Sequence, residues 1–307
     1  MYNVPILLII FKRKDVALKT LASIKSIKPT KLYIAADGSR DSVEGEKEMV
    51  EETRRAVLDA IDWECDIKTR FSEKNQGCAN GVYNAINWLF DNEDCGIVIE
   101  DDCIMQNCFF KFTEELLEKY KDDNRIGMIC GANYAAQISI PDSYVFSRYK
   151  SCHGWATWKR AWKLMDMEMS WRDSPYYNSI ICNMGYKSKD YHYWKYRLKA
   201  IDLNDVSAWD WQWYFTLAAN NMLAIIPKYT LTTNIGFGKD ATHTTGHATK
   251  QYISTKELEF PLKHPKYVAP YLPFEKEYYK QNDTRYEKLK RLLPFSIKMK
   301  IKKLLRK

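Results

Sequence analysis

GIVIEDD, residues 96–102, is the stretch that decides the fold class of this chain. Its apolar part, 96–99, shows no alternation with polar residues and stops abruptly at three acids. A short, continuous apolar run is typical of a strand buried on both faces of a parallel sheet. The stretch therefore predicts a buried strand over 96–100 whose carboxyl end carries carboxylates.

The same pattern recurs along the first half of the chain. Apolar runs predict strands at 5–11 (PILLIIF) and 31–36 (KLYIAA), and shorter ones at 68–71 and 126–130. Segments with helical periodicity lie between them, at 44–61, 79–90 and 109–120. Strands that alternate with helices predict an α/β fold, with a mostly parallel, Rossmann-like sheet and helices on both faces.

Polar clusters follow three of the predicted strands, and ligands bind at the carboxyl ends of strands in such sheets. The clusters are Lys12-Arg13, Asp37-Gly38-Ser39 and Glu100-Asp101-Asp102. We expect them to meet in one crevice.

The three adjacent acids at 100–102 repel one another unless a cation lies among them. A hard divalent cation with oxygen ligands fits, and it would bridge a carboxylate and a diphosphate. The alternative is a solvated acidic turn or a helix cap. Arg13 is suited to a nucleotide or its phosphates, and Asp37 to a base or a ribose. In isolation, a surface basic pair and an ordinary turn explain these two residues equally well.

Several segments, in their order, resemble the GT-A fold of nucleotide-diphospho-sugar glycosyltransferases. They are Phe11-Lys12-Arg13, Ala36-Asp37-Gly38-Ser39, Asn75-Gln76-Gly77 and Val98-Ile99-Glu100-Asp101-Asp102. The E-D-D form is most similar to the N-acetylglucosaminyltransferase I type, as are Gly154-Trp155, Trp209-Asp210-Trp211 and Phe237-Gly238-Lys239 with His243. Bacterial glycosyltransferases of surface-polysaccharide pathways are also similar. The resemblance covers roughly residues 4 to 245.

The resemblance implies roles for the residues of the first half. Asp102 would bind Mn²⁺ or Mg²⁺, and the metal would hold the donor diphosphate. Asp101 would face the ribose and Glu100 the donor sugar. Arg13 and Asp37 would bind the nucleotide.

It implies roles in the second half as well. Asp210 would be the general base, although this chain has one aspartate where the family segment has two. Asp210 could instead cap a helix over 211–219. Gly154 and Trp155 would lie by the sugar, and we expect Trp158 and Trp162, at helical spacing from Trp155, in the core. The donor loop would comprise Phe237, Gly238, Lys239 and His243.

The implied activity is metal-dependent transfer of a hexosyl or N-acetylhexosaminyl group from a nucleotide-sugar, UDP-sugars being favoured, to an acceptor hydroxyl. No second nucleophile is evident, so the transfer would invert the anomeric centre. One rival is a sugar-nucleotide nucleotidyltransferase, which needs a Gly-rich loop that Phe11–Asp15 lacks. Another is a non-catalytic sugar- or nucleotide-binding protein of the same fold.

The charge lies mainly at the carboxyl end. Residues 276–307 hold twelve Lys/Arg and three Asp/Glu, whereas the whole chain carries +8, so the body is nearly neutral. This distribution argues against nucleic acid as a partner. The stretch 289–307 fits an interfacial helix on an anionic membrane, or a solvated basic tail. The acceptor would be a saccharide or a lipid-linked saccharide.

We expect a catalytic domain over 1–250, with a nucleotide-sugar half to about 130 and an acceptor half from about 131, followed by a wrapping tail over 251–307. None of the eight cysteines forms a C-x-x-C pair. Neither a signal peptide nor a ~20-residue apolar span is visible. These features predict a cytoplasmic protein with reduced thiols, and the basic tail would allow it to lie peripherally at the inner face of the membrane.

Overall fold

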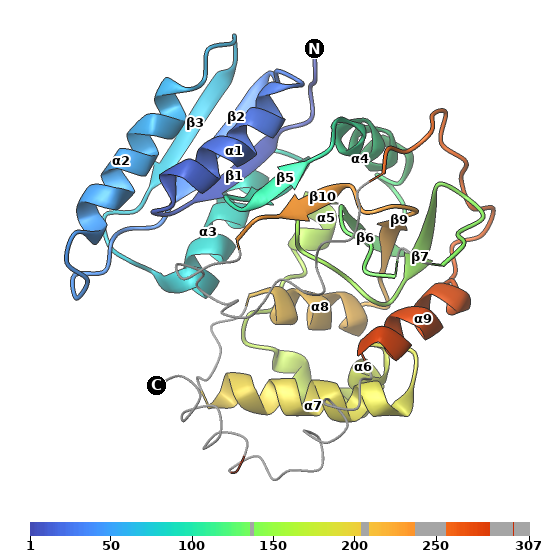
Figure 1. Cartoon of the computed structure of the whole chain (residues 1–307). Helices are drawn as coiled ribbons and strands as arrows, with labels where there is room; N and C mark the ends of the chain where they lie inside the picture. Colours follow the sequence, from blue (N-terminus) through green and yellow to red (C-terminus); the bar gives the residue numbers. More distant parts are fainter. Residues whose placement is uncertain (136–137, 204–208, 237–255, 283–296, 298–307) are drawn as a thin grey trace.

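One eight-stranded sheet runs through the part of the chain that the structure describes. The computed structural model describes residues 1–135, 138–203, 209–236, 256–282 and Ile297. The strand order is β3-β2-β1-β4-β8-β6-β9-β7 (Figure 1). The strands are β1 (Ile6–Ile10), β2 (Lys31–Ala36), β3 (Asp66–Phe71), β4 (Cys95–Glu100), β6 (Ile126–Cys130), β7 (Tyr144–Ser147), β8 (Trp155–Trp158) and β9 (Leu223–Pro227).

The sheet is mostly parallel, as predicted. Strand β1 pairs in parallel with β2 and β4, and β2 with β3. Strand β8 is antiparallel to both β4 and β6, so β4 and β6 point the same way. β9 is parallel to β6, and only β7 also runs against the others.

Helices cover both faces of the sheet. Alternate residues of its strands point to opposite sides and are apolar on both, so each face must be covered to be removed from water. Ile6, Leu8 and Ile10 pack into one core, with residues of α1 (Lys14–Lys25), α2 (Glu46–Asp59) and α4 (Asn107–Lys119). Leu7 packs into a second core, with residues of α3 (Gly77–Asn92), α5 (Lys159–Trp162) and α8 (Asp210–Ala219). The predicted α/β class is therefore confirmed.

The secondary structure of the tryptophan-rich segment 155–162 differs from the prediction, which was that Trp155, Trp158 and Trp162 have helical spacing. Trp155 and Trp158 lie in strand β8, and only Trp162 lies in a helix. Residues three apart on a strand face opposite ways, so Trp155 and Trp158 belong to different cores. Trp158 and Trp162 are each 3 % exposed, which confirms that they are core residues.

Smaller elements complete the second half. The third core contains residues of η1 (Ser170–Asp173), α6 (Tyr177–Cys182), α7 (Ser188–Asp202) and α8. A two-stranded antiparallel ribbon joins β5 (Cys103–Met105) to β10 (Thr232–Asn234). This ribbon brings residues near 234 to the end of β4.

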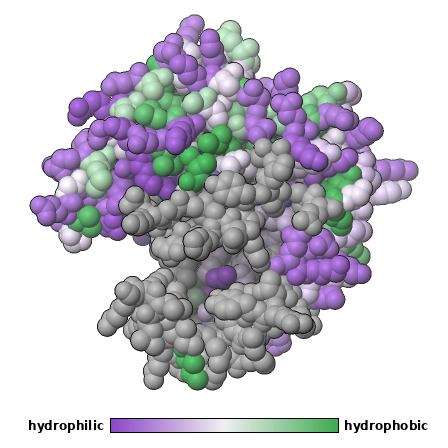
Figure 2. Space-filling model, in the orientation of Figure 1, coloured by the Kyte–Doolittle hydropathy of each residue, from purple (hydrophilic) through white to green (hydrophobic). Residues whose placement is uncertain are grey.

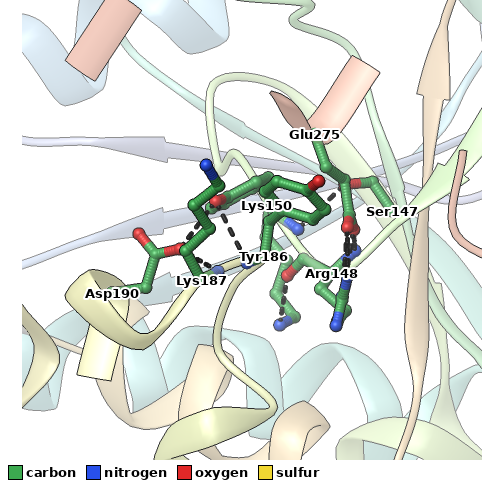
Figure 3. Close-up of polar contacts among 8 residues, drawn as sticks. Ser147, Arg148, Lys150, Tyr186, Lys187, Asp190 and Glu275 are labelled. Carbon is green, nitrogen blue, oxygen red and sulfur yellow. Dashed lines mark hydrogen bonds and ion pairs between the residues drawn. The ribbon is translucent and has the colours of Figure 1, made fainter. Parts of the chain in front are cut away.

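Helix α9 (Leu272–Asn282) is anchored to the end of β7 by one buried carboxylate. Glu275 is 0 % exposed and accepts hydrogen bonds from the backbone N–H of Arg148 (2.7 Å) and from Ser147 Oγ (3.2 Å). It also pairs with the Arg148 guanidinium (Figure 3). Tyr149, the next residue, stacks on Tyr278 of α9 with ring centroids 4.3 Å apart. The helix thus fixes the segment that leads to Cys152 and Gly154.

Replacing Glu275 with glutamine is expected to lower the free energy of unfolding by about 1–3 kcal/mol. The amide cannot accept all of these hydrogen bonds, and it leaves Arg148 without its ionic partner. Urea unfolding checks this. Glu277→Gln on the same helix, whose partner Lys280 is exposed, serves as the control and should change the free energy little. Equal effects of the two variants would contradict the anchoring role.

Two predictions fall outside the described residues. These are the donor loop, Phe237, Gly238, Lys239 and His243, and the membrane-binding stretch 289–307. Among the described helices, none is long and apolar enough to cross a membrane. All eight cysteines are free thiols. Figure 2 shows that hydrophilic residues cover much of the described surface on this face, with smaller apolar patches between them.

Candidate functional site

The acids that end β4 are held in place by their own backbone. Asp101 O accepts a hydrogen bond from Thr20 Oγ1 of α1 at 2.6 Å. Asp102 O accepts one from the Ile235 N–H, just after β10, at 2.8 Å. Both contacts fix the turn between β4 and β5, so the carboxylates are positioned before any ligand binds.

Arg13 joins two of these acids. It lies between β1 and α1, and its guanidinium pairs with Asp101 and, at 3.0 Å, with Asp102. The two strand ends therefore meet, as predicted from the parallel sheet. The structure shows Arg13 with the acids, and its contact with a nucleotide stays a prediction.

The site is rich in negative charge. Burial, followed by the charges of Asp102, Asp101 and Asp210, raises the pKa of Glu100 to about 8. Burial also raises the pKa of Asp101 to about 6, although Arg13 opposes the shift. Glu100 is therefore largely protonated at neutral pH, and a further cation would favour the ionised form of these acids.

The donor atoms at this point suit a hard divalent cation. Asp102 is the more accessible of the two paired acids, with a side chain 19 % exposed against 8 % for Asp101. Among the described residues no three His, Cys, Asp or Glu side chains are grouped as a metal centre. Mg²⁺ commonly takes one or two carboxylates and completes its shell with water and substrate phosphates. Asp102 would hold such an ion, and a bound diphosphate would supply the other ligands.

Asp37 lies at the end of β2 and is fully hydrogen-bonded within the protein. Its Oδ1 accepts from the N–H groups of Gly38 and Gln76, each at 2.9 Å. Its Oδ2 accepts from the Gly77 N–H at 3.0 Å and from Asn75 Nδ2 at 3.1 Å. The carboxylate thus satisfies the free N–H groups at the start of α3. A contact between Asp37 and a nucleotide stays a prediction.

Asp210 brings the second half of the chain to the acids. It is the first residue of α8, and burial raises its pKa to about 6. Its negative charge also contributes to the raised pKa of Glu100 across the site. The backbone N–H groups of Trp211 and Asp210 oppose the rise in the pKa of Asp210. The cap position of α8 is Trp209, and no side-chain cap hydrogen bond is present there, so the alternative that Asp210 caps the helix is not borne out. The raised pKa of Asp210 is suited to accepting a proton near neutral pH.

The prediction that Trp155 lies by the sugar is wrong. Its ring is 0 % exposed and stacks on Trp209 with centroids 5.8 Å apart, in a cluster with Trp162 and Trp213. Strand β8 is interior to the sheet, so both of its faces are covered. Trp155 supports the residue that precedes Asp210 and does not line the site.

Gly154 has a backbone reason for being glycine. Its φ is +64°, and a Cβ there would lie 2.6 Å from Met105 of β5. Its carbonyl accepts a hydrogen bond from the Gly131 N–H at 2.8 Å. The segment 151–154 can therefore pass closely beside the β5–β10 ribbon. Its predicted contact with the sugar remains untested.

Sequence reasoning missed two residues that hold Asp102. Asn234 Nδ2 donates to Asp102 Oδ1 at 3.2 Å, and Asn234 Oδ1 accepts from the Gly236 N–H at 2.8 Å. A Cβ on Gly236 would lie 2.0 Å from Asp102 Oδ2, so any larger residue there would displace the carboxylate. The chain thus contacts the acids immediately before the predicted donor loop. The Asn-x-Gly spacing was the available signal.

Comparisons with known proteins give only distant similarities. No model of a known protein family matches the chain, and no curated protein sequence matches it. The apo form of mouse xyloside xylosyltransferase 1 aligns over 72 % of this chain and 83 % of its own, with 11 % identity and a TM-score of 0.36. HddC from Yersinia pseudotuberculosis aligns over 52 % and 78 %, with 7 % identity and a TM-score of 0.33. A putative glucose-1-phosphate thymidylyltransferase from Bacillus anthracis aligns over 63 % and 83 %, with 10 % identity and a TM-score of 0.32. Such alignments establish neither a common family nor a common activity.

Proposed function

We propose that this protein is a metal-dependent glycosyltransferase. It transfers a hexosyl or N-acetylhexosaminyl group from a nucleotide-diphospho-sugar, with UDP-sugars favoured, to an acceptor hydroxyl, with inversion. One observation carries the proposal. Asp210, whose pKa is raised by burial, lies close enough to the end of β4 for its charge to raise the pKa of Glu100, and Arg13 pairs there with Asp101 and Asp102.

The two sides of the site divide the chemistry. A divalent cation at Asp102 would stabilise the charge that develops on the diphosphate leaving group. Asp210 takes the proton from the acceptor hydroxyl, which is a poor nucleophile until it is deprotonated. In the proposal Glu100 and Asp101 contact the donor sugar and the ribose, and Arg13 and Asp37 support the nucleotide.

The type of enzyme and its setting belong to the proposal as well. The resemblance to the N-acetylglucosaminyltransferase I type and to bacterial surface-polysaccharide enzymes supports a saccharide or lipid-linked acceptor. Synthesis would take place at the inner face of a membrane that 289–307 contacts. A nucleotidyltransferase is less well supported, because 11–15 has no glycine to cradle a triphosphate.

A thermal shift experiment tests the donor side. A nucleoside diphosphate or nucleotide-sugar should raise the unfolding midpoint of the protein only when Mn²⁺ is present, by several degrees at saturation. Ligand at 100 times its Kd stabilises the native state by about 2.7 kcal/mol. Asp102→Ala should abolish the metal-dependent part of the shift.

Asp62→Ala is the matched control, because Asp62 is an exposed aspartate paired with Lys25 far from the site. It should leave the shift unchanged. If no nucleotide changes the midpoint with or without metal, the proposal fails. If nucleotide binds and the donor is intact after incubation with every saccharide tried, the non-catalytic alternative gains support. Release of pyrophosphate from a nucleoside triphosphate and a sugar phosphate would instead identify a nucleotidyltransferase.

A further inference from the structure

Arg197 lies on α7, beside the residue that follows Asp210. Its Cζ is 4.5 Å from the centroid of the Trp211 ring and 4.8 Å from that of Tyr193. Its Nη2 donates a hydrogen bond to the Tyr193 hydroxyl at 2.6 Å. Helices α7 and α8 lie side by side in Figure 1, and Trp194 packs edge-on against Phe215 between them. The guanidinium is thus held by two aromatic rings at the acceptor side of the site.

Most of the hydrogen-bond donors of Arg197 are unused. Its Nε is buried and has no hydrogen-bond partner, and in the described part of the chain no carboxylate forms an ion pair with it. Nearby arginines differ in this respect, since Arg172 pairs with Asp202 at 2.7 Å and Arg148 with Glu275. A buried N–H without a partner is costly, because the Nε of Arg197 has lost water without gaining an acceptor among the described residues.

The Nη N–H groups that do not bond Tyr193 are left for a ligand, whereas the Nε–H is buried. Arginine stacks on aromatic rings through its flat faces, which leaves the N–H groups in its plane for a planar or tetrahedral anion. Lys195 and Lys199 add positive charge to the same helix, which also carries Asp190 and Asp202. A neutral sugar could pack against the aromatic rings, but it would not neutralise the positive charge of Arg197.

The charge of Arg197 also reaches the proposed base. It lowers the pKa of Asp210 and thereby opposes the effect of burial. No hydrogen bond joins the two residues in the described structure, so this effect of Arg197 acts through space. A ligand group bound to Arg197 would therefore lie close to the hydroxyl that Asp210 deprotonates.

We propose that Arg197, with Tyr193 and Trp211, forms a subsite for an anionic group on the acceptor, either a carboxylate or a phosphate. This inference rests on the proposed function, because it places the acceptor at Asp210. It adds that the acceptor is acidic, as a uronic acid or a phosphorylated saccharide is. Arg197 selects it by a charge-assisted hydrogen bond.

A binding experiment without donor or turnover tests the subsite. The probes are methyl glucuronide, methyl glucoside, glucose 6-phosphate and inorganic phosphate, each titrated by calorimetry. The wild-type protein should bind at least one anionic sugar about tenfold or more tightly than methyl glucoside, and Arg197→Gln should remove that preference. A preference for methyl glucuronide identifies a carboxylate, and one for glucose 6-phosphate identifies a phosphate. Arg197→Lys keeps the charge and should retain part of the preference.

Arg172→Gln is the control for a general loss of positive charge and should leave the binding preference unchanged. Circular dichroism confirms that each variant is folded. Equal binding of anionic and neutral probes by the wild-type protein overturns the proposal, as does an unchanged preference in Arg197→Gln. Arg197 would then only join α7 to α8. The nucleotide thermal shift experiment does not involve Arg197. If only the sugar titration fails, the transferase proposal therefore stands without the anionic subsite. If the thermal shift experiment fails, the proposed role of Asp210 as a base is lost as well.

Discussion

Replacing Asp210 with asparagine is expected to lower kcat for sugar transfer by about 10²- to 10⁴-fold, the range that a positioned general base contributes. Asparagine keeps the size of the side chain but cannot take up a proton. The residue begins α8 and is largely removed from water, which raises its pKa to about 6. At neutral pH it is therefore ionised and more basic than an exposed aspartate. The rate is measured as release of nucleoside diphosphate in the presence of acceptor.

Measuring donor binding distinguishes the loss of a base from a general disturbance of the structure. Asp210 is not hydrogen-bonded to the Arg13 cluster, so the metal-dependent thermal shift should survive in Asp210→Asn. Asp202→Asn is the matched control, because Asp202 is an aspartate near the end of α7 that pairs with Arg172. It should keep the wild-type kcat. A variant Asp210→Asn with unchanged kcat would exclude this residue as the base.

The pH dependence follows from the same pKa. A carboxyl whose pKa is raised to about 6 must lose its proton to act as a base, so kcat should rise as the pH rises through about 6. Among the described residues, the charged and titratable groups that interact electrostatically with Asp210 include Glu100, Cys78, Cys152, Tyr214 and Arg197. Of these, Arg197 alone lowers its pKa. Arg197→Gln should therefore move the rise to higher pH, and Asp210→Asn should flatten it.

The central strands of the sheet could be predicted because their burial leaves a simple trace in the sequence. Strands β1, β2 and β4 are covered on both faces, so nearly every residue in them is apolar. Their ends agree with the expected ranges to within one residue. The convergence of Arg13 with the acids at 101–102 follows from parallel direction alone, since carboxyl ends of such strands share one edge.

The support of the site could not be predicted in the same way. Asn234 is 132 positions from Asp102 in the sequence and reaches it through the β5–β10 ribbon, whose strands are each three residues long. A strand of that length has no detectable period. Likewise, nothing local indicates that Asp37 is consumed by hydrogen bonds to the turn at 75–77. Such contacts depend on the assembled fold.

The error at Trp155 has a definite cause. Trp155, Trp158 and Trp162 have the spacing of one helix face, but the chain is a strand as far as Trp158. In a strand that spacing sends Trp155 and Trp158 to opposite faces of the sheet. The pattern therefore identified buried residues correctly and assigned the wrong element. Trp155 alone of the three was predicted to lie by the sugar, because glycine precedes it. Gly154 has another explanation, namely its positive φ and the closeness of Met105.

Replacing Trp155 with alanine is expected to lower the free energy of unfolding by about 3–5 kcal/mol, the usual cost of removing a large buried ring. The ring is 0 % exposed and contacts the rings of Trp209, Trp162 and Trp213. No other side chain can fill that space without moving the tryptophans around it. Urea or thermal unfolding measures the loss.

Trp88→Ala provides the comparison, since Trp88 is only partly buried on α3 and contacts Tyr33 edge-on. It should cost clearly less. The two readings of Trp155 predict different results, because a ring that stacks on a sugar affects donor or acceptor KM with little loss of stability, whereas a core ring does the reverse. A stable Trp155→Ala protein with a raised KM would restore the sugar-binding reading. A large loss of stability, with Trp209 no longer supported beside Asp210, would place Trp155 in the framework that holds the base.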